Sequence, residues 1–208
     1  FDLAISLYGP LSGTLVGLSG SRWRVGFADE ASSKNFDHSV QGGRGPRTRH
    51  EIDWVRHLGG QPGAEIPDNL ISAGRSVNAW CQDKVGPKGS YTRLVLHTGA
   101  RTGEAKLWPN QHWHDLVTLL DKHAMLQIIF VGGAAEAGTA SALLHNLDKR
   151  HLSFAGRTTI PQLASILKTS DLTISADSGP LHLSALMGRP TLGLYGPTNP
   201  HLSGPYGI

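Results

Sequence analysis

Residues 171–200 read DLTISADSGPLHLSALMGRPTLGLYGPTNP, and this stretch decides the fold of the segment around it. Its apolar and β-branched run at 172–176 is typical of a buried strand, and the Asp-Ser-Gly-Pro that follows is typical of a turn that opens a helix. Residues 181–187 predict a short, nearly all-apolar helix that Gly188 ends, and residues 191–195 predict a second buried strand. We therefore expect a strand–helix–strand unit of an α/β fold.

Polar side chains gather where the first of these strands ends. Asp177, Ser178 and His182 follow it, and open α/β sheets bind ligands outside the carboxyl ends of their strands. A helix that begins near Ser178 would offer backbone N–H groups and a positive dipole end to a phosphate or diphosphate, while Asp177 would accept hydrogen bonds from sugar hydroxyls. The alternative is that Asp177 or Ser178 only caps the helix and His182 is an ordinary interface residue.

Strands and helices alternate along the whole chain, which predicts parallel sheets covered by helices on both faces. In the first 90 residues we expect strands at 3–7 and 23–27, a polar loop at 28–47, and helices at 11–18, 50–58 and 68–83, the last with Asp68 as its N-cap. Beyond residue 90 we expect strands at 93–97, 127–131, 152–154, 172–176 and 191–195, and helices at 111–123, 134–147 and 160–168.

Composition argues against several classes of protein. The 208 residues are 39% hydrophobic, and the net charge of +3 is too mild and too scattered to favour nucleic-acid binding. The single cysteine excludes an intrachain disulfide, and no apolar run approaches the roughly 18 residues of a membrane span, so we expect a cytoplasmic protein without a transmembrane segment. His112 and His114 do not share a helix face, so a metal site there is not expected.

A loop of small residues follows the strand expected at 93–97. Thr98 and Gly99 begin it, and their backbone can approach a phosphate closely, with Lys106 and Arg101 nearby as cations. The alternative is an exposed loop with solvated charges, which is our preferred interpretation for Arg101.

The chain resembles glycosyltransferase family 9, the lipopolysaccharide heptosyltransferases. Residues 177–200 match the family pattern D-[ST]-G-x-x-H-L-x-A-x-x-G-x-P-x-x-x-L-[YF]-G-P-T-x-P. Residues 94–100 (LVLHTGA) and 105–109 (AKLWP) are similar to the H-P-G-A and A-K-x-W-P segments of the family, with Thr98 in place of the usual Pro. The resemblance implies the glycosyltransferase B architecture, in which two Rossmann-like domains with parallel sheets face each other across a cleft.

The resemblance also implies a domain division and a function. Residues 1–60 would be the last part of the acceptor-side domain, 61–90 a linker and helix, and 91–208 the donor-binding domain. The protein would transfer a heptose, or a related sugar, from a nucleotide donor such as ADP-heptose to a lipid-linked acceptor, the lipopolysaccharide inner core, with no cofactor or metal. The acceptor would bring it to the surface of the inner membrane.

Family positions carried onto this chain give a donor site. Lys106 would contact the donor phosphates and Glu136 would lie near the nucleoside, although a first-turn acid favoured by the helix dipole is an equal alternative for Glu136. The remaining donor-binding residues of this set would be Thr98, Gly99, Asp177, Ser178, Gly179 and His182. The general base of the family is an Asp near the N-terminus, which we expect upstream of Phe1, because the chain would start roughly 70 residues later than a family member does, given the usual domain size. The chain alone would then not transfer sugar.

Two other functions remain open at this stage. One is a nucleotide-sugar-binding module without catalysis. The other is a different two-domain sugar-nucleotide enzyme, such as an epimerase, which would act without an acceptor.

Overall fold

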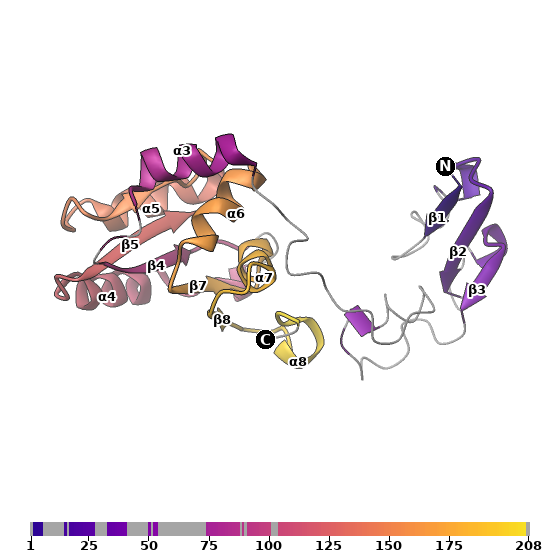
Figure 1. The fold of residues 1–208 in the computed structure, drawn as a ribbon. Coiled ribbons are helices and arrows are strands. Elements are labelled where there is room, and N and C mark those ends of the chain that lie inside the picture. Colours follow the sequence, from indigo (N-terminus) through magenta and orange to yellow (C-terminus); the bar gives the residue numbers. More distant parts are fainter. Residues whose placement is uncertain are drawn as a thin grey trace. The chain divides into compact units, whose positions relative to one another are not determined.

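The chain divides into two compact units in a computed structural model. The first comprises Phe1–Glu65 with His201–Ser203, and the second comprises Ile66–Pro200 with Gly204–Ile208. The structure describes residues 2–5, 15, 17–27, 33–40, 50, 52–53, 74–87, 89, 91–100 and 104–206. Figure 1 labels most of the helices and strands of both units. The three-part division at residues 60 and 90 stays a prediction.

The described part of the first unit is a small parallel sheet. Its strands β1 (Leu3–Ile5), β2 (Trp23–Phe27) and β3 (His38–Val40) lie in the order β1-β2-β3. A short 3-10 helix, η1 (Ser33–Asn35), precedes β3. Gly26 lies directly under the Phe36 ring, where any added Cβ would collide with it. This close approach joins the segment before β3 to the middle of the sheet.

Two predictions for the first 90 residues are wrong. Residues 28–47 were expected to form a polar loop, but they contain η1 and β3. A three-residue strand reading His-Ser-Val is too short to show a period of two, and its pairing with β2 comes from the backbone. The helix expected from Asp68 is α3 (Arg75–Val85), which begins after Gly74 at the N-cap; Asp68 itself lies outside the described residues. So do most of the helices expected at 11–18 and 50–58; of their described residues, 15, 17–18 and 52–53 are helical and 50 is not.

The second unit contains a five-stranded parallel sheet in the order β6-β5-β4-β7-β8. The strands are β4 (Thr92–His97), β5 (Leu126–Val131), β6 (Leu152–Ser153), β7 (Leu172–Ala176) and β8 (Thr191–Leu194). The chain starts in the middle at β4, moves outward through β5 and β6, and then returns to β7 on the other side of β4. The connection after β4 therefore leads toward one end of the sheet and the connection after β7 toward the other. Such a switch point, here between β4 and β7, is where doubly wound sheets bind ligands.

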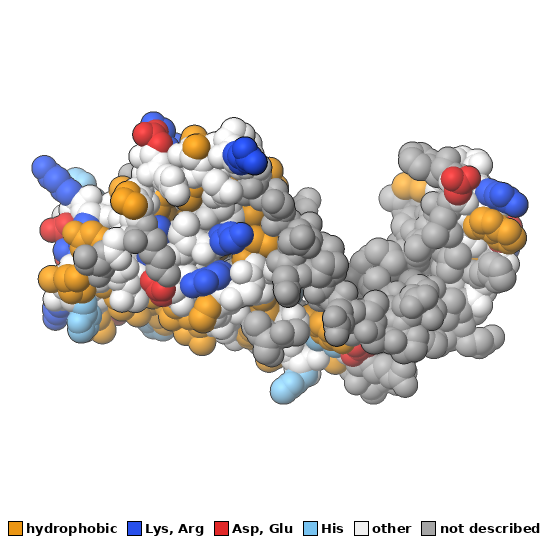
Figure 2. All heavy atoms as spheres, in the orientation of Figure 1, with side chains coloured by type: hydrophobic (Ala, Val, Ile, Leu, Met, Phe, Trp, Pro, Cys, Tyr) orange, Lys and Arg blue, Asp and Glu red, His pale blue; other side chains and the backbone are white. Residues whose placement is uncertain are grey.

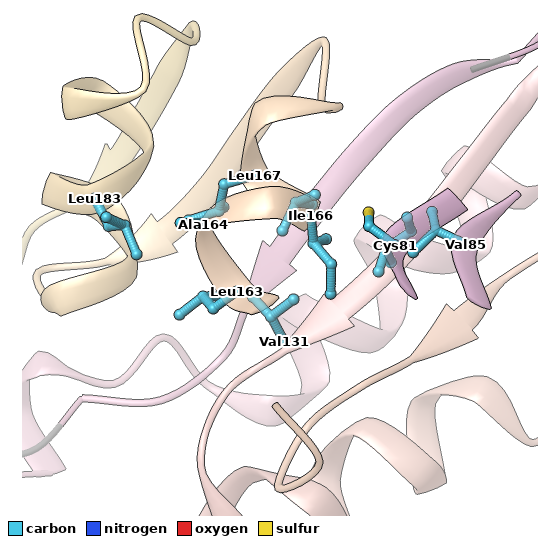
Figure 3. Close-up of a cluster of buried hydrophobic side chains, with 10 residues drawn as sticks. Cys81, Val85, Val131, Leu163, Ala164, Ile166, Leu167 and Leu183 are labelled. Carbon is cyan, nitrogen blue, oxygen red and sulfur yellow. The ribbon is translucent and has the colours of Figure 1, made fainter. Parts of the chain in front are cut away.

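Helices cover both faces of this sheet because its central strands are apolar on both sides. Along β4 and β5, residues Val95, Ile129 and Val131 pack against α3 and against α6 (Ile160–Lys168), in the cluster drawn in Figure 3. The alternate residues Leu96, Ile128 and Phe130 pack against α4 (Asn110–Asp121) and α5 (Ala137–Leu144). Burying each large apolar side chain contributes about 1.5–3 kcal/mol, so this two-layered core is the main source of stability of the unit.

The remaining helices position the loops. The predicted helix at 134–147 is split into η3 (Ala134–Glu136) and α5, and the Glu136 side chain accepts a hydrogen bond from the Gly133 N–H at the start of η3. Pro180 lies in the first turn of α7 (Gly179–Leu186), and Gly188, at φ +65°, follows its end, which confirms both predictions. A last helix, α8, spans Pro200–Ser203.

Candidate functional site

The Asp177 carboxylate collects polar side chains from three segments at the carboxyl end of β7. Lys106 Nζ donates to its Oδ2 at 2.7 Å, and Thr198 Oγ1 donates to the same oxygen at 2.8 Å. His182 Nε2 lies 3.9 Å from the other oxygen, Oδ1. The three partners come from η2 (Glu104–Lys106), from the loop after β8 and from α7, so Asp177 ties together segments that are far apart in sequence.

Backbone packing holds Lys106 in this position. Gly196, in the loop that also carries Thr198, lies so close to η2 that an added Cβ would be 2.5 Å from the Ala105 carbonyl oxygen. Only a residue without a side chain allows this approach. The loop after β8 and η2 therefore form one wall, which presents Lys106 and Thr198 to Asp177.

Asp177 is ionised at neutral pH. Its side chain is only 9% exposed, and burial alone would raise its pKa, but the hydrogen bonds from Lys106 and Thr198 and the charge of Lys106 outweigh burial and lower the pKa below its usual value. The result is a partly buried ion pair with Lys106, whose side chain is 22% exposed.

The capping interpretation of Asp177 and Ser178 is not supported. Ser178 is the N-cap residue of α7, but its side chain makes no capping hydrogen bond. Its hydroxyl lies instead 3.0 Å from His97 Nδ1 and 2.9 Å from Ser175 Oγ. Asp177 is engaged by Lys106 and Thr198. Neither side chain therefore caps α7. Pro180 has no N–H and the Leu181 N–H donates to the Ser178 carbonyl oxygen at 3.2 Å, so the Gly179 N–H and the positive end of the helix dipole are what this end offers to an anion.

His97 and Glu136 lie at the neighbouring strand ends. His97 ends β4 and is 5% exposed; burial lowers its pKa, and the opposing field of Glu136 does not compensate. Glu136 accepts a hydrogen bond from the Gly133 N–H at 2.7 Å through Oε2. A Cβ on Gly99 would collide with the Glu136 carboxylate, so the loops after β4 and β5 touch here. Glu136 thus lies in the first turn of η3, as the first-turn interpretation had it, and also lies beside the strand ends; its place near the nucleoside stays a prediction.

A cavity of about 470 Å³ opens beside these strand ends. Its volume is within the usual range for small-molecule sites. The apolar part of its wall comes from the start of α6 and from the length of α7, namely Ile160, Leu163, Pro180, Leu183 and Leu186. Polar groups line the rest, among them His97, Thr158, Thr159 and His182. The cavity therefore combines an apolar surface for a flat ring with a few hydrogen-bonding groups.

The structure groups the site residues expected from the sequence into two sets. Lys106, Asp177 and His182 meet around the Asp177 carboxylate, and Gly99 and Glu136 meet beside His97. Gly179 and His182 line the cavity, whereas Thr98 is 7% exposed and is not among its lining residues. Arg101 lies outside the described residues.

Some site residues were not predicted. Thr198 was missed although it lies in the Gly-Pro-Thr of the quoted pattern, and Ser175 was missed although a polar residue inside an apolar strand is a signal. His97 was quoted only as part of a motif. The cavity wall at Thr159, Ile160 and Leu163 carries no sequence signal, because it comes from the way α6 lies over the sheet.

Other binding chemistries find no support in the described part of the chain. It contains no cluster of three His, Cys, Asp or Glu side chains that could hold a metal ion. Nor does any described helix have the length and apolar character needed to cross a membrane. On the face of the second unit drawn in Figure 2, basic, acidic and hydrophobic side chains are interspersed among the coloured residues.

The chain is similar to proteins of known activity. Lipopolysaccharide heptosyltransferase 1 of Salmonella typhimurium is 32% identical over 114 residues, which make up 55% of this chain and 35% of that protein. The matched segment thus spans about a third of the length of that relative.

Two solved structures share the fold. The family 9 glycosyltransferase from Veillonella parvula superposes with a TM-score of 0.80 at 19% identity, covering 99% of this chain and 60% of that one. E. coli heptosyltransferase WaaC with ADP superposes with a TM-score of 0.74 at 24% identity, covering 100% of this chain and 64% of that one. These likenesses establish the α/β fold with parallel sheets that glycosyltransferase B heptosyltransferases have.

The family model described as glycosyltransferase family 9 (heptosyltransferase) matches residues 1–208, the whole of the sequence. Its match agrees with the relatives, with the fold and with the polar cluster at the switch point. The chain therefore belongs to glycosyltransferase family 9.

Proposed function

We propose that this chain carries the donor-binding half of a heptosyltransferase, which transfers a heptose or a related sugar from ADP-heptose to the lipopolysaccharide inner core. One observation carries the proposal: the Lys106–Asp177 ion pair lies next to the uncapped start of α7, at the switch point of the sheet. A cation and a free helix N-terminus at that point suit a diphosphate.

The three parts of the donor fit three parts of the site. The nucleoside occupies the cavity of about 470 Å³, with its base against the apolar wall from α6 and α7. The diphosphate lies at the Gly179 end of α7 and is contacted by Lys106. The sugar points toward Asp177 and His182, whose acceptor oxygens and ring nitrogen can bond its hydroxyls.

This arrangement assigns binding and leaving-group stabilisation to the chain. When the bond between sugar and diphosphate breaks, negative charge builds up on the departing diphosphate, and Lys106 offsets that charge together with the Gly179 N–H and the positive end of the α7 dipole. No metal or other cofactor is required by this scheme. The general base that takes the proton of the acceptor hydroxyl is not assigned to any described residue.

Sugar transfer is preferred over the two alternatives because of the family. The relative from Salmonella typhimurium is named a heptosyltransferase. The WaaC structure contains ADP, which supports adenine as the base of the donor nucleotide here. A lipid-linked acceptor would place the protein on the cytoplasmic surface of the inner membrane. An assay of the complete protein with ADP-heptose alone and with a lipid-linked acceptor separates the functions. Turnover only with acceptor supports transfer, turnover of donor alone supports an epimerase, and no turnover supports a binding module.

The donor assignment has a direct test in this chain. A ligand that binds only the folded state raises the melting temperature by mass action. We expect millimolar ADP to raise the melting temperature more than UDP or GDP does. A strong shift with UDP or GDP and none with ADP would reject the adenine nucleotide.

A further inference from the structure

A compact network surrounds the buried His97 at the carboxyl end of β4. His97 Nδ1 lies 3.1 Å from Ser175 Oγ and 3.0 Å from Ser178 Oγ, and the two serine oxygens lie 2.9 Å apart. Ser175 Oγ also donates to the Ala176 carbonyl oxygen at 2.8 Å. Four contacts at hydrogen-bonding distance therefore share the protons of two hydroxyls and one ring nitrogen.

Counting these protons fixes the tautomer of His97. Each serine hydroxyl supplies one proton, so an unprotonated Nδ1 would leave two protons for four contacts. With a proton on Nδ1, the N–H is shared between the two serine oxygens, Ser178 donates to Ser175, and Ser175 donates to the Ala176 carbonyl. All four contacts are then satisfied, and a shared N–H of this kind is common.

The second ring nitrogen is consequently an acceptor. Burial disfavours the charged imidazolium and lowers the pKa of His97, and Glu136, the charged group that acts on it, has one oxygen already bonded by the Gly133 N–H. A neutral ring with its proton on Nδ1 has a lone pair on Nε2.

The position of Nε2 points to a ligand. Among the described residues, no group makes a hydrogen bond to this nitrogen. The fully buried side-chain N and O atoms of these residues that lack a hydrogen-bond partner are Arg93 Nη1, Trp113 Nε1, Thr191 Oγ1 and Tyr195 Oη. Because Nε2 is not one of them, it is not fully buried. His97 lines the cavity of about 470 Å³, which is where Nε2 can be reached. An acceptor in an otherwise 5% exposed residue is thus open to whatever fills the cavity.

We propose that His97 Nε2 accepts a hydrogen bond from an N–H or O–H group of the donor nucleoside, and that it thereby selects the nucleoside and keeps the diphosphate away from this point. The inference rests on the proposed donor site. A phosphate oxygen has no proton to give, so a neutral Nε2 repels it, whereas a ribose hydroxyl or an exocyclic amine satisfies it. Lys106 and the start of α7 are left as the place for the diphosphate.

Two substitutions of His97 distinguish the role of Nδ1 from the role of Nε2. In His97→Asn the side-chain amide N–H replaces Nδ1–H toward the two serines but nothing replaces Nε2, whereas in His97→Gln the longer side chain places the amide oxygen near Nε2. His114→Asn, at an exposed histidine on α4, is the matched control. Calorimetry of the 208-residue chain would compare ADP with 2′-deoxy-ADP, 3′-deoxy-ADP and purine riboside 5′-diphosphate, each of which lacks one donor group of the nucleoside.

We expect wild type to bind one of these analogues about 3- to 10-fold more weakly than ADP, the usual effect of one hydrogen bond. His97→Asn should bind that analogue and ADP equally, while His97→Gln should keep much of the discrimination. Equal discrimination by wild type and His97→Asn would overturn the inference and leave the donor site intact. Failure of wild type to bind ADP at all would overturn both.

A measurement on wild type covers the case in which the variants do not fold. In 15N-histidine-labelled chain, NMR should show a neutral His97 with Nδ1 protonated and with an Nε2 resonance that shifts when ADP binds. Binding without net proton uptake should accompany it. A protonated Nε2, an Nε2 resonance unmoved by ADP, or uptake of about one proton would contradict the inference, because an imidazolium would be bonding the diphosphate.

Discussion

The strands of the second sheet begin along one side of the sheet, called here the amino edge, and end along the opposite side, the carboxyl edge. Both edges hold buried or half-buried charged groups, but these groups have different roles. At the amino edge, Arg150 donates to the Leu126 and Asp121 carbonyl oxygens at 2.7 and 2.6 Å, and His151 joins the Ile128 N–H to the Asp121 carboxylate at 2.8 and 2.9 Å. At the carboxyl edge, Lys106 and Asp177 pair beside an open cavity. Burial of charge alone therefore does not identify a site in this protein; what distinguishes the carboxyl edge is that its groups can be reached by a ligand.

The largest expected effect is on the free energy of unfolding, from a substitution that removes Arg150 from the hydrogen-bond network at the amino edge. Arg150→Met removes a guanidinium whose side chain is 15% exposed. The Leu126 and Asp121 carbonyl oxygens lose this donor, and the Asp121 carboxylate keeps His151 as its remaining side-chain partner. Loss of one partner of such a network costs about 3 kcal/mol of unfolding free energy. Urea unfolding measures it, with Arg75→Met at an exposed helix start as the control. Folded Arg150→Met should bind ADP with unchanged affinity, and a large loss of affinity would remove the distinction between the edges.

Asp177→Asn tests whether the charged group at the carboxyl edge binds the sugar of the donor. The affinity for ADP-heptose should fall, since a hydrogen bond to a charged group contributes about 1.5–3 kcal/mol. The affinity for ADP should stay the same or rise, because the substitution removes a negative charge from the neighbourhood of the diphosphate. Titration calorimetry with both ligands measures this, and equal losses for both would contradict the assignment of Asp177 to the sugar.

Gly99→Ala tests the contact between the loops after β4 and β5. The new methyl group would collide with the Glu136 carboxylate, and such overpacking costs about 1–3 kcal/mol. Gly138→Ala, in α5 with open space around it, should instead stabilise slightly. Thermal unfolding compares the two, and adding Glu136→Ala to Gly99→Ala should recover stability. No recovery in the double variant would show that Glu136 does not lie over Gly99.

The elements that the sequence predicts best are those with the clearest local residue pattern. Strands β4, β5 and β7 were predicted within a residue because their apolar runs are flanked by turn residues, and α7 because Pro180 and Gly188 mark its ends. The short β3 was missed because three residues carry no periodicity. Lys106, Asp177 and His182 were expected together through the family pattern, whereas the hydrogen bond from Thr198 depends on the path of the loop after β8. The His97 network depends on two strands being neighbours, which no local pattern gives.

The smallest expected effect is on pH dependence, and both edges contribute. The pKa values of His97 and His151 are lowered in the folded protein, mainly by burial, so the unfolded chain binds their protons first. The stability that they contribute is therefore fully present above the unfolded-state pKa of about 6.5 and is lost as the pH falls below it. Melting temperature should decrease from pH 7 to pH 5.5, and His151→Gln should show a weaker decrease. A melting temperature that rises over this interval would contradict the assigned direction.

In the proposed function, the carboxyl edge binds a nucleoside diphosphate with Lys106 at its phosphates. The most direct test is calorimetry of ADP and of adenosine binding to wild type, Lys106→Met and the exposed control Lys122→Met. We expect Lys106→Met to weaken ADP binding by about 1.5–3 kcal/mol, the contribution of a hydrogen bond to a charged group, and to leave adenosine binding unchanged. Unchanged ADP binding in Lys106→Met, or equal losses for ADP and adenosine, would contradict it.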